Sequence, residues 1–243
     1  MERRGNGSGT RLTLDLWHPN CWAIEATESA PGGVLAHAIY HAPKAGTETG
    51  TVNGLFTAFA DSNGGLEELL DGIESSAHSG ELMRLQERFG TGHAAPGNVA
   101  REFFLEYDPG DMICPVLLEH GFVHSEPVRI EDGREYWRVG FAGERSGIES
   151  ALEGVRGDAN AEVSVERIAS TNGTGRSERR RRLDSLTSTQ REVFELARAE
   201  GYYEWPRGIS TRDLAAEVDV SKTTLLEHLR KAESKLLDPA SQE

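Results

Sequence analysis

The chain has 243 residues, of which 40 are acidic and 26 basic, so its formal net charge is −14. No run approaches the roughly 20 apolar residues that span a membrane, and residues 1–9 lack the apolar core of a signal peptide, so we expect a cytoplasmic protein without a membrane part. Two cysteines, Cys21 and Cys114, are too few and too far apart to indicate a disulfide framework.

The negative charge is distributed unevenly along the chain. Residues 1–175 contain 27 acidic and 13 basic residues, whereas residues 176–243 contain 13 of each. Only four of the basic residues are lysines, and such an acidic, lysine-poor composition is typical of a protein that charge keeps soluble in concentrated salt. Length and charge together predict a disordered N-terminus (1–9), an acidic domain (10–169) and a separate neutral C-terminal domain.

Apolar periodicity divides the acidic domain into two halves, about 10–90 and 98–169. Each half predicts a strand, a helix, two strands, a helix and a strand. The expected bounds are 12–16, 21–28, 33–41, 51–60, 66–74 and 81–89 in the first half, and 101–107, 111–120, 122–130, 135–141, 144–155 and 162–168 in the second. The fold class is therefore α+β, with two ferredoxin-like βαββαβ units in tandem; side by side they would resemble an ACT-like ligand-sensing domain.

One short segment of this domain combines residues with metal-binding or redox chemistry. In Trp17-His18-Pro19-Asn20-Cys21-Trp22, an imidazole and a thiol lie three residues apart between aromatic side chains. His18 and Cys21 could share a transition metal, or Cys21 could be a redox-responsive thiol. A metal would need further ligands, and the candidates are His37, His41, His120, His124 and Cys114. The alternative is that Trp17, Cys21 and Trp22 pack in the core and His18 is a hydrogen-bonded turn residue; no resident cofactor is predicted.

Residues 170–184 are polar, contain glycine and include four consecutive arginines, Arg179, Arg180, Arg181 and Arg182. This composition cannot bury a core, so the segment is expected to be a linker. Its arginines either lie along DNA phosphates or in a minor groove, or they are simply solvated.

A helix over about 188–200 follows, because Thr187 can cap it, Gln190 stands at the capping-box spacing, and apolar residues continue one face. The aromatic loop 201–208 comes next. Its aromatic side chains are expected to plug the gap between helices, while Arg207 either packs or contacts the DNA backbone.

Residues 210–236 predict two short helices joined by a tight turn. Ser210 caps the first helix and Ala215 is small enough for a helix crossing. Asp219 occupies the turn, where a left-handed backbone is needed, and Val220 plugs the corner. Ser221 caps the second helix, whose apolar stripe includes Leu225 and Leu229. This is the helix-turn-helix pattern, within a domain of residues 185–238.

The second helix is the expected reader of a DNA major groove. The residues near its N-terminus that point away from the apolar stripe have side chains suited to phosphates, base edges or a thymine methyl group. The predicted DNA-binding residues are Thr211, Arg212, Ser221, Lys222, Thr223, Leu226, Glu227, Arg230 and Lys231. Because this half of the chain is neutral, we expect it to depend less on counterion release and more on base and shape readout.

The residues of this region also resemble a known family. Leu186-Thr187, Gln190-Arg191-Glu192, Gly201-Tyr202-Tyr203, Pro206-Arg207, Asp213-Leu214-Ala215, Val220-Ser221 and His228-Leu229-Arg230-Lys231-Ala232-Glu233 together resemble the bacterio-opsin-activator type of helix-turn-helix domain of halophilic archaea. The resemblance covers about 186–237, and Asp219 departs from the more usual glycine. It implies a transcription regulator whose preceding domain senses a signal or mediates assembly.

The favoured function is therefore a sequence-specific regulator that binds double-stranded DNA, with an effector that the sequence does not identify. A homodimer is expected because one helix-turn-helix covers only a half-site. Two alternatives stay open: a module that docks on the basal transcription machinery without DNA readout, and a metal- or redox-responsive sensor using His18 and Cys21. An enzyme is not expected, because the sequence lacks a phosphate-binding glycine loop, a nucleophile elbow and paired metal-ligand motifs.

Overall fold

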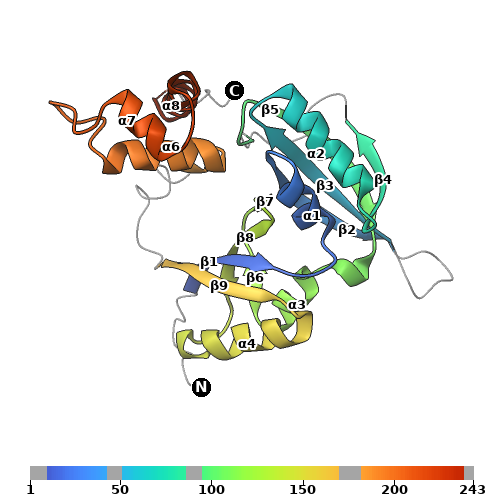
Figure 1. Cartoon of the computed structure of the whole chain (residues 1–243). Helices are drawn as coiled ribbons and strands as arrows, with labels where there is room; N and C mark the ends of the chain where they lie inside the picture. The colour runs from blue at the N-terminus through green and yellow to red at the C-terminus, as the bar shows by residue number, and fades with distance from the viewer. Residues whose placement is uncertain (1–9, 43–50, 86–94, 170–181, 238–243) are drawn as a thin grey trace. The chain divides into compact units, whose positions relative to one another are not determined.

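The computed structural model describes residues 10–42, 51–85, 95–169 and 182–237. The described residues fall into two compact units, one from residues 10–42, 51–85 and 98–169 and the other from residues 95–97 and 182–237 (Figure 1). We call them the sheet unit and the helical unit and describe each by itself. Among the described residues, no helix is long and apolar enough to cross a membrane.

The sheet unit contains the predicted elements in the predicted order. Its strands are β1 (Thr10–Trp17), β2 (Gly33–Ala42), β3 (Thr51–Ala60), β4 (Ser79–Arg84), β5 (Val99–Tyr107), β6 (Phe122–His124), β7 (Val128–Glu131), β8 (Arg134–Phe141) and β9 (Glu162–Ala169). Its helices are α1 (Trp22–Ser29), α2 (Asn63–Ser75), α3 (Cys114–Glu119) and α4 (Ile148–Ala159), with short 3₁₀ turns at Pro109–Asp111 and Arg145–Gly147.

Two local predictions in this unit need correction. The strand expected over 122–130 is broken into β6 and β7, with Pro127, which has no backbone N–H to donate, in the gap. The helix expected from Asp111 begins only at Cys114 and has no side-chain cap, because the Asp111 carboxylate instead lies 3.2 Å from Nδ1 of His78. β7 and β8 form a hairpin, with left-handed Asp132 and Gly133 at its turn.

The strand order, β4-β5-β3-β2-β7-β8-β1-β9, is not that of two separate ferredoxin-like units. A self-contained first half would pair β1 with β3 and β4. Instead, β1 lies between β8 and β9, while β5 lies between β3 and β4 (Figure 1). The first strands of the two halves are thus exchanged, and β2 joins the halves by pairing with β7. The result is one mixed α and β unit with a large antiparallel sheet.

The core of the sheet unit follows from strand alternation. β8 alternates half-buried and buried residues along its whole length, and its buried set is Glu135, Trp137, Val139 and Phe141. Opposite them, Leu12, Leu14 and Leu16 of β1 are buried in register. Helices α1 and α2 pack together, with α2 against β3, β4 and β5, and α4 packs against β9.

The helical unit contains α6 (Ser188–Ala199), α7 (Thr211–Glu217) and α8 (Lys222–Leu237). The three helices enclose a small core of buried side chains from Val193, Ala197, Tyr202, Leu214, Ala215, Leu225 and Leu229. This core is much smaller than that of the sheet unit, and every residue in it comes from one continuous stretch of the chain. The prediction of C-terminal helices is confirmed.

Candidate functional site

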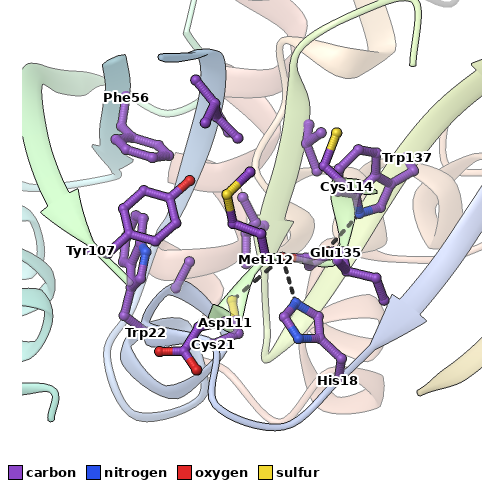
Figure 2. A pocket seen from close by; sticks show the side chains of 16 residues that line it. His18, Cys21, Trp22, Phe56, Tyr107, Asp111, Met112, Cys114, Glu135 and Trp137 are labelled. Carbon is purple, nitrogen blue, oxygen red and sulfur yellow. Dashed lines mark hydrogen bonds and ion pairs between the residues drawn. The ribbon is translucent and has the colours of Figure 1, made fainter. Parts of the chain in front are cut away.

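The sheet unit contains a buried polar cluster, which we define as His18, Cys21 and Glu135 and which lies beside a cavity (Figure 2). His18 follows β1, Cys21 precedes α1, and Glu135 is on β8. Their exposed fractions are only 7%, 8% and 5% (Glu135). Glu135 Oε1 lies 3.6 Å from His18 Nε2 and accepts a hydrogen bond of 3.4 Å from Cys21 Sγ. Its other oxygen, Oε2, accepts a 2.7 Å hydrogen bond from Trp137 Nε1.

Burial and the Glu135 carboxylate shift the pKa values of this cluster. Burial alone would lower the pKa of His18, but the hydrogen bond and negative charge of Glu135 outweigh it, so the pKa is raised. The pKa of Cys21 is raised well above its usual value, first by burial and then by the Glu135 charge. A buried thiol without a compensating cation therefore stays protonated, which argues against a constitutively reactive Cys21.

The other predicted ligand candidates do not join this cluster. His37 bonds Thr57 at 2.8 Å, and His120 bonds Asp158 at 2.8 Å. Cys114 Sγ lies 4.0 Å from His124 Nδ1, and the side chain of His41 lies outside the described residues. The third member, Glu135, was missed in the sequence, although its place in the buried phase of β8 was a signal that could have found it. Among the described residues, no other group of three such side chains converges.

In the helical unit, the predicted caps and turn are confirmed. Thr187 Oγ1 accepts from the backbone N–H of Gln190 at 3.3 Å, and Ser210 Oγ accepts from Asp213 N at 3.2 Å. Asp219 has φ of 50°, the left-handed conformation expected at the turn. Ser221 Oγ accepts from Thr224 N at 3.1 Å and so begins α8. The left-handed Asp219 therefore ends α7, and the Ser221 cap sets the residue at which α8 begins.

One face of α8 is buried and the opposite face is exposed. Leu225, Leu229 and Ala232 face the core. Five of the residues predicted to read DNA are exposed, at the start of α8 (Ser221, Lys222) and on its outward side (Thr223, Glu227, Arg230). Arg212 on α7 is also exposed, whereas Thr211, Leu226 and Lys231 are half-buried. The hydroxyl of Ser221 already acts as a cap and contacts Thr224 Oγ1 at 2.8 Å, so a DNA contact would compete with that role.

Charges on this face are partly paired. Lys231 Nζ lies 2.7 Å from Glu227 Oε1, one helical turn away, and this hydrogen bond and charge lower the pKa of Glu227. For Lys222 and Arg230, no ion pair with any described residue is found. These two side chains are therefore the cations that α8 offers most directly to an anionic ligand.

The loop between α6 and α7 departs from the prediction that its aromatic residues plug the core. Tyr202 is buried as expected, and the Arg207 guanidinium lies over its ring at 4.5 Å, which favours the packing role of Arg207. Tyr203 is exposed and donates to Glu233 at 2.8 Å. Trp205 is 97% exposed, so for this side chain the prediction was wrong. A 2.9 Å bond from Gly208 N to Gly201 O closes the base of the loop.

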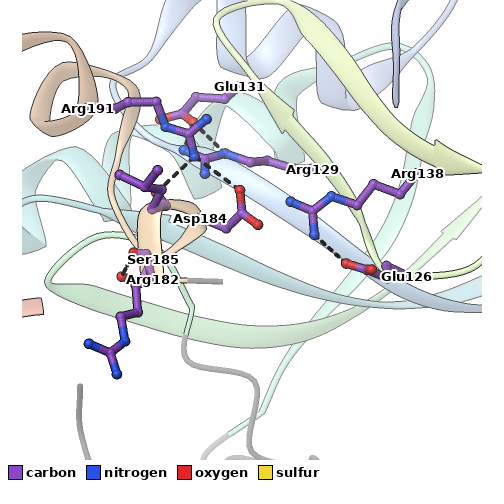
Figure 3. Close-up of polar contacts among 9 residues, drawn as sticks. Glu126, Arg129, Glu131, Arg138, Arg182, Asp184, Ser185 and Arg191 are labelled. Carbon is purple, nitrogen blue, oxygen red and sulfur yellow. Dashed lines mark hydrogen bonds and ion pairs between the residues drawn. The ribbon is translucent and has the colours of Figure 1, made fainter. Parts of the chain in front are cut away.

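The arginine segment is only partly within the described residues. Arg179, Arg180 and Arg181 lie outside them. Arg182 donates to the carbonyl of Leu236 at 3.4 Å. Ser185 Oγ donates to the carbonyl of Arg182 at 2.6 Å (Figure 3). Nearby, Arg191 pairs with Asp184 at 3.2 Å. Arg182 thus helps attach the start of this unit to the end of α8.

Comparison with known proteins identifies both parts of the chain. Residues 186–238 match the HTH_10 family, described as an HTH DNA-binding domain, and residues 11–161 match HVO_2525_N, a family of N-terminal domains. The transcriptional regulator NarO of Haloferax volcanii is 49% identical over 55 residues, which cover 23% of this chain and 26% of that protein. The dimethyl sulfoxide reductase transcriptional activator of Halobacterium salinarum is 28% identical over 138 residues, 53% of this chain and 58% of that protein.

The chain thus spans only part of the length of each of these relatives, whose names describe transcription regulators. The match to the N-terminal family covers more than half of the chain. The geometry of α7, the turn and α8 agrees with the match of residues 186–238 to the HTH DNA-binding domain family. The chain therefore belongs to the HVO_2525_N family and has a helix-turn-helix domain of the bacterio-opsin-activator type.

Proposed function

We propose that this protein is a transcription regulator that binds double-stranded DNA sequence-specifically, with α8 in the major groove. The observation that carries the proposal is the exposed face of α8, where Lys222, Thr223 and Arg230 project from a helix whose other face is buried. The caps of α7 and α8 and the left-handed Asp219 support the proposal, because they define the two helices and the tight turn of a helix-turn-helix. The relatives named above are also regulators.

The chemistry of the face suggests a role for each side chain. Arg230 can donate two hydrogen bonds to a guanine, and Thr223 can contact a base edge or a phosphate. Lys222, in the first turn, is placed for a phosphate, and half-buried Leu226 can contact a thymine methyl group. Thr211, Arg212, Ser221, Glu227 and Lys231 border this set. The Glu227–Lys231 pair reduces the net charge at the border, which favours readout of bases over general attraction to phosphates.

Single alanine substitutions of Lys222, Thr223 and Arg230 test the proposal. Target sites would come from genome-wide mapping of DNA occupancy, and affinity would be measured by fluorescence anisotropy in molar KCl. Arg230→Ala should weaken specific binding about tenfold to a hundredfold, the loss of a good base contact. Arg198→Ala, which removes the same charge from an exposed position of α6, is the matched control and should retain affinity. Unchanged specific binding in a variant that carries all three alanine substitutions together would refute the role of α8.

For the sheet unit, we propose that it senses a signal or mediates assembly. The order of its elements and the exchange of β1 and β5 support a duplicated ferredoxin-like or ACT-like origin, in which neither half is complete alone. We further propose that the protein is a homodimer, because paired half-sites need a two-fold protein. We also propose that it acts in the cytoplasm and has no catalytic activity. Sedimentation analysis with and without a two-half-site DNA tests the dimer: binding of one chain to a full site would contradict it.

A second candidate function rests on Trp205. A tryptophan that is 97% exposed on a closed loop is a suitable anchor for a protein partner, such as a component of the basal transcription machinery. Trp205→Ala should then leave DNA affinity unchanged but reduce transcription in a reconstituted assay. A parallel loss of DNA affinity would instead assign Trp205 to the DNA interface.

A further inference from the structure

The buried cluster has the donor set of a transition-metal site. His18 offers an imidazole nitrogen, Cys21 a sulfur and Glu135 a carboxylate oxygen, and these three atoms lie within 4.8 Å of one another. Zn²⁺ binds such atoms at about 2.0–2.3 Å, so a tetrahedral site places neighbouring ligand atoms about 3.3–3.6 Å apart. Two of the three separations, 3.6 Å (nitrogen to oxygen) and 3.4 Å (sulfur to oxygen), are close to those of a formed site, and the third, nitrogen to sulfur, is within 4.8 Å.

Neighbouring groups orient two of the three ligands. His18 Nδ1 lies 3.0 Å from the carbonyl oxygen of Pro19, which can only accept, so a neutral imidazole with its proton on Nδ1 would offer the Nε2 lone pair to an ion between Cys21 and Glu135. The Trp137 indole holds Glu135 Oε2, which leaves Oε1 directed at the other two ligands (Figure 2). A histidine held by a carbonyl and a carboxylate held by an N–H are the supporting contacts that metal ligands usually have.

The charge balance of the cluster also favours a cation. Binding of a divalent ion to a neutral imidazole, a thiolate and a carboxylate gives a site with no net charge, which is the least costly arrangement in a buried environment. On binding, the Cys21 thiol loses its proton to solvent while the sulfur gains the metal bond. Without a metal, a protonated His18 imidazole, whose Nε2 lies 3.6 Å from Glu135 Oε1, is the group in the cluster that can balance the buried carboxylate, and the metal would take the place of that proton.

A cavity adjoins the cluster and supplies an open coordination position. Its volume is about 60 Å³, and its lining includes Tyr107, Asp111, Met112 and Cys114 besides the three ligands. One water needs about 10–15 Å³, so the cavity has room for a water or a small exchangeable ligand at the metal. Three protein ligands with one open position distinguish a responsive or reactive metal site from a closed structural one.

We propose that the sheet unit binds one divalent transition-metal ion through His18 Nε2, Cys21 Sγ and Glu135 Oε1, with an exchangeable fourth ligand in the adjoining cavity. Zn²⁺ fits the mixed nitrogen, sulfur and oxygen donor set best. Because the three ligands come from the segment between β1 and α1 and from β8, the ion would tie the exchanged strand β1 to its neighbour β8. The proposal does not depend on DNA binding.

Cobalt substitution tests the site directly. Full-length protein without an affinity tag is stripped with a chelator and titrated with Co²⁺, whose thiolate bond gives an intense near-ultraviolet charge-transfer band. One equivalent per chain should produce the band together with the visible bands of a tetrahedral ion, and Zn²⁺ should displace it. Cys21→Ser should abolish the charge-transfer band, and His18→Gln and Glu135→Gln should weaken Co²⁺ binding.

The second cysteine provides a matched control. Cys114 lines the same cavity but is not one of the three ligands, so Cys114→Ser removes the other thiol of the site without removing a donor atom and should keep the band. The absence of a charge-transfer band in the unsubstituted protein, or its equal loss in Cys114→Ser and Cys21→Ser, would overturn the proposal.

A substitution outside the ligand set covers the case in which a ligand variant does not fold. Trp137→Phe keeps all three ligands but removes the donor that orients Glu135, and a loss of this kind typically weakens metal binding about 10–100-fold. Trp17→Phe, a partly buried tryptophan outside the cluster, should leave Co²⁺ affinity unchanged. Equal affinities in both variants, with circular dichroism unchanged, would contradict the assigned geometry.

Discussion

The sheet unit and the helical unit differ in how far apart in the sequence their contacting residues lie. In the sheet unit, β1 pairs with β8 and β9, and the hydrogen bond from Cys21 to Glu135 spans 114 residues. In the helical unit, the caps of α6, α7 and α8 span three residues each. A sheet held by distant strand pairing is lost when one strand is removed, whereas a helix cap made by neighbouring residues can be removed without removing the fold.

Separating the two halves of the sheet unit should have the largest effect. A fragment of residues 95–169 lacks β1, so β8 and β9 lose the strand between them and the buried Leu12, Leu14 and Leu16. We expect this fragment to be unfolded, as judged by its circular dichroism spectrum and by narrow chemical-shift dispersion in NMR spectra. Adding a fragment of residues 1–94 should restore the fold, because it supplies β1 and accepts β5. An independently folded fragment 95–169 would mean that the halves can exist without strand exchange.

A substitution in the core of the helical unit should abolish DNA binding without changing the stability of the sheet unit. Leu229 is buried where α8 meets the other helices, so Leu229→Ala should cost about 2–5 kcal/mol, enough to unfold a core of this size. Trp17, Trp22 and Trp137 belong to the sheet unit and Trp205 is already exposed, so tryptophan emission reports on the sheet unit. DNA affinity should fall while the emission-detected unfolding midpoint stays constant.

The control for this substitution is Leu237→Ala. Leu237 is on the same helix but is exposed, so its truncation should change neither DNA affinity nor helix content. A lower emission-detected unfolding midpoint in Leu229→Ala would show that the stabilities of the two units are coupled, contrary to this prediction.

A single cap should have a smaller effect. Thr187→Ala removes the acceptor for the Gln190 backbone N–H and should destabilise the helical unit by about 1 kcal/mol. Thr189 is exposed within the same first turn, so Thr189→Ala makes the same chemical change without losing the cap. The free energies of unfolding of the two variants are compared by urea unfolding followed by circular dichroism at 222 nm. If Thr187→Ala lowered this free energy less than Thr189→Ala, Thr187 would not be a stabilising cap.

The same difference between the units explains what the sequence could predict. The caps at Thr187, Ser210 and Ser221 and the left-handed Asp219 depend on residues close in sequence, so the helix-turn-helix was predicted correctly. The order of strands and helices in the sheet unit was also predicted, since periodicity is local. The exchange of β1 and β5 was not, because alternation shows which face of a strand is buried but not which strand lies beside it.

The candidate sites follow the same division. His18 and Cys21 were identified because they are neighbours in one motif, whereas Glu135 joins them only through the pairing of β1 with β8. Trp205 was expected inside because it is large and aromatic, but the bond between Gly201 and Gly208 closes the loop below it and leaves it outside. In both cases the deciding contact is one that composition does not encode.

Asp219→Gly should have the smallest effect, and its sign tests whether the turn is local. With φ of 50°, Asp219 is strained by up to about 1–2 kcal/mol, while glycine removes this strain but costs about 0.5–1 kcal/mol in unfolded-state entropy. The net gain in unfolding free energy should therefore lie between about 0 and 1.5 kcal/mol, with a midpoint of about 0.7 kcal/mol. Asp219→Asn separates charge from backbone effects and should be neutral, whereas Asp219→Ala should be destabilising. Equal stability of the Gly and Ala variants in urea would show that the left-handed turn does not limit the stability of the helical unit, and that longer-range packing decides it there as in the sheet unit.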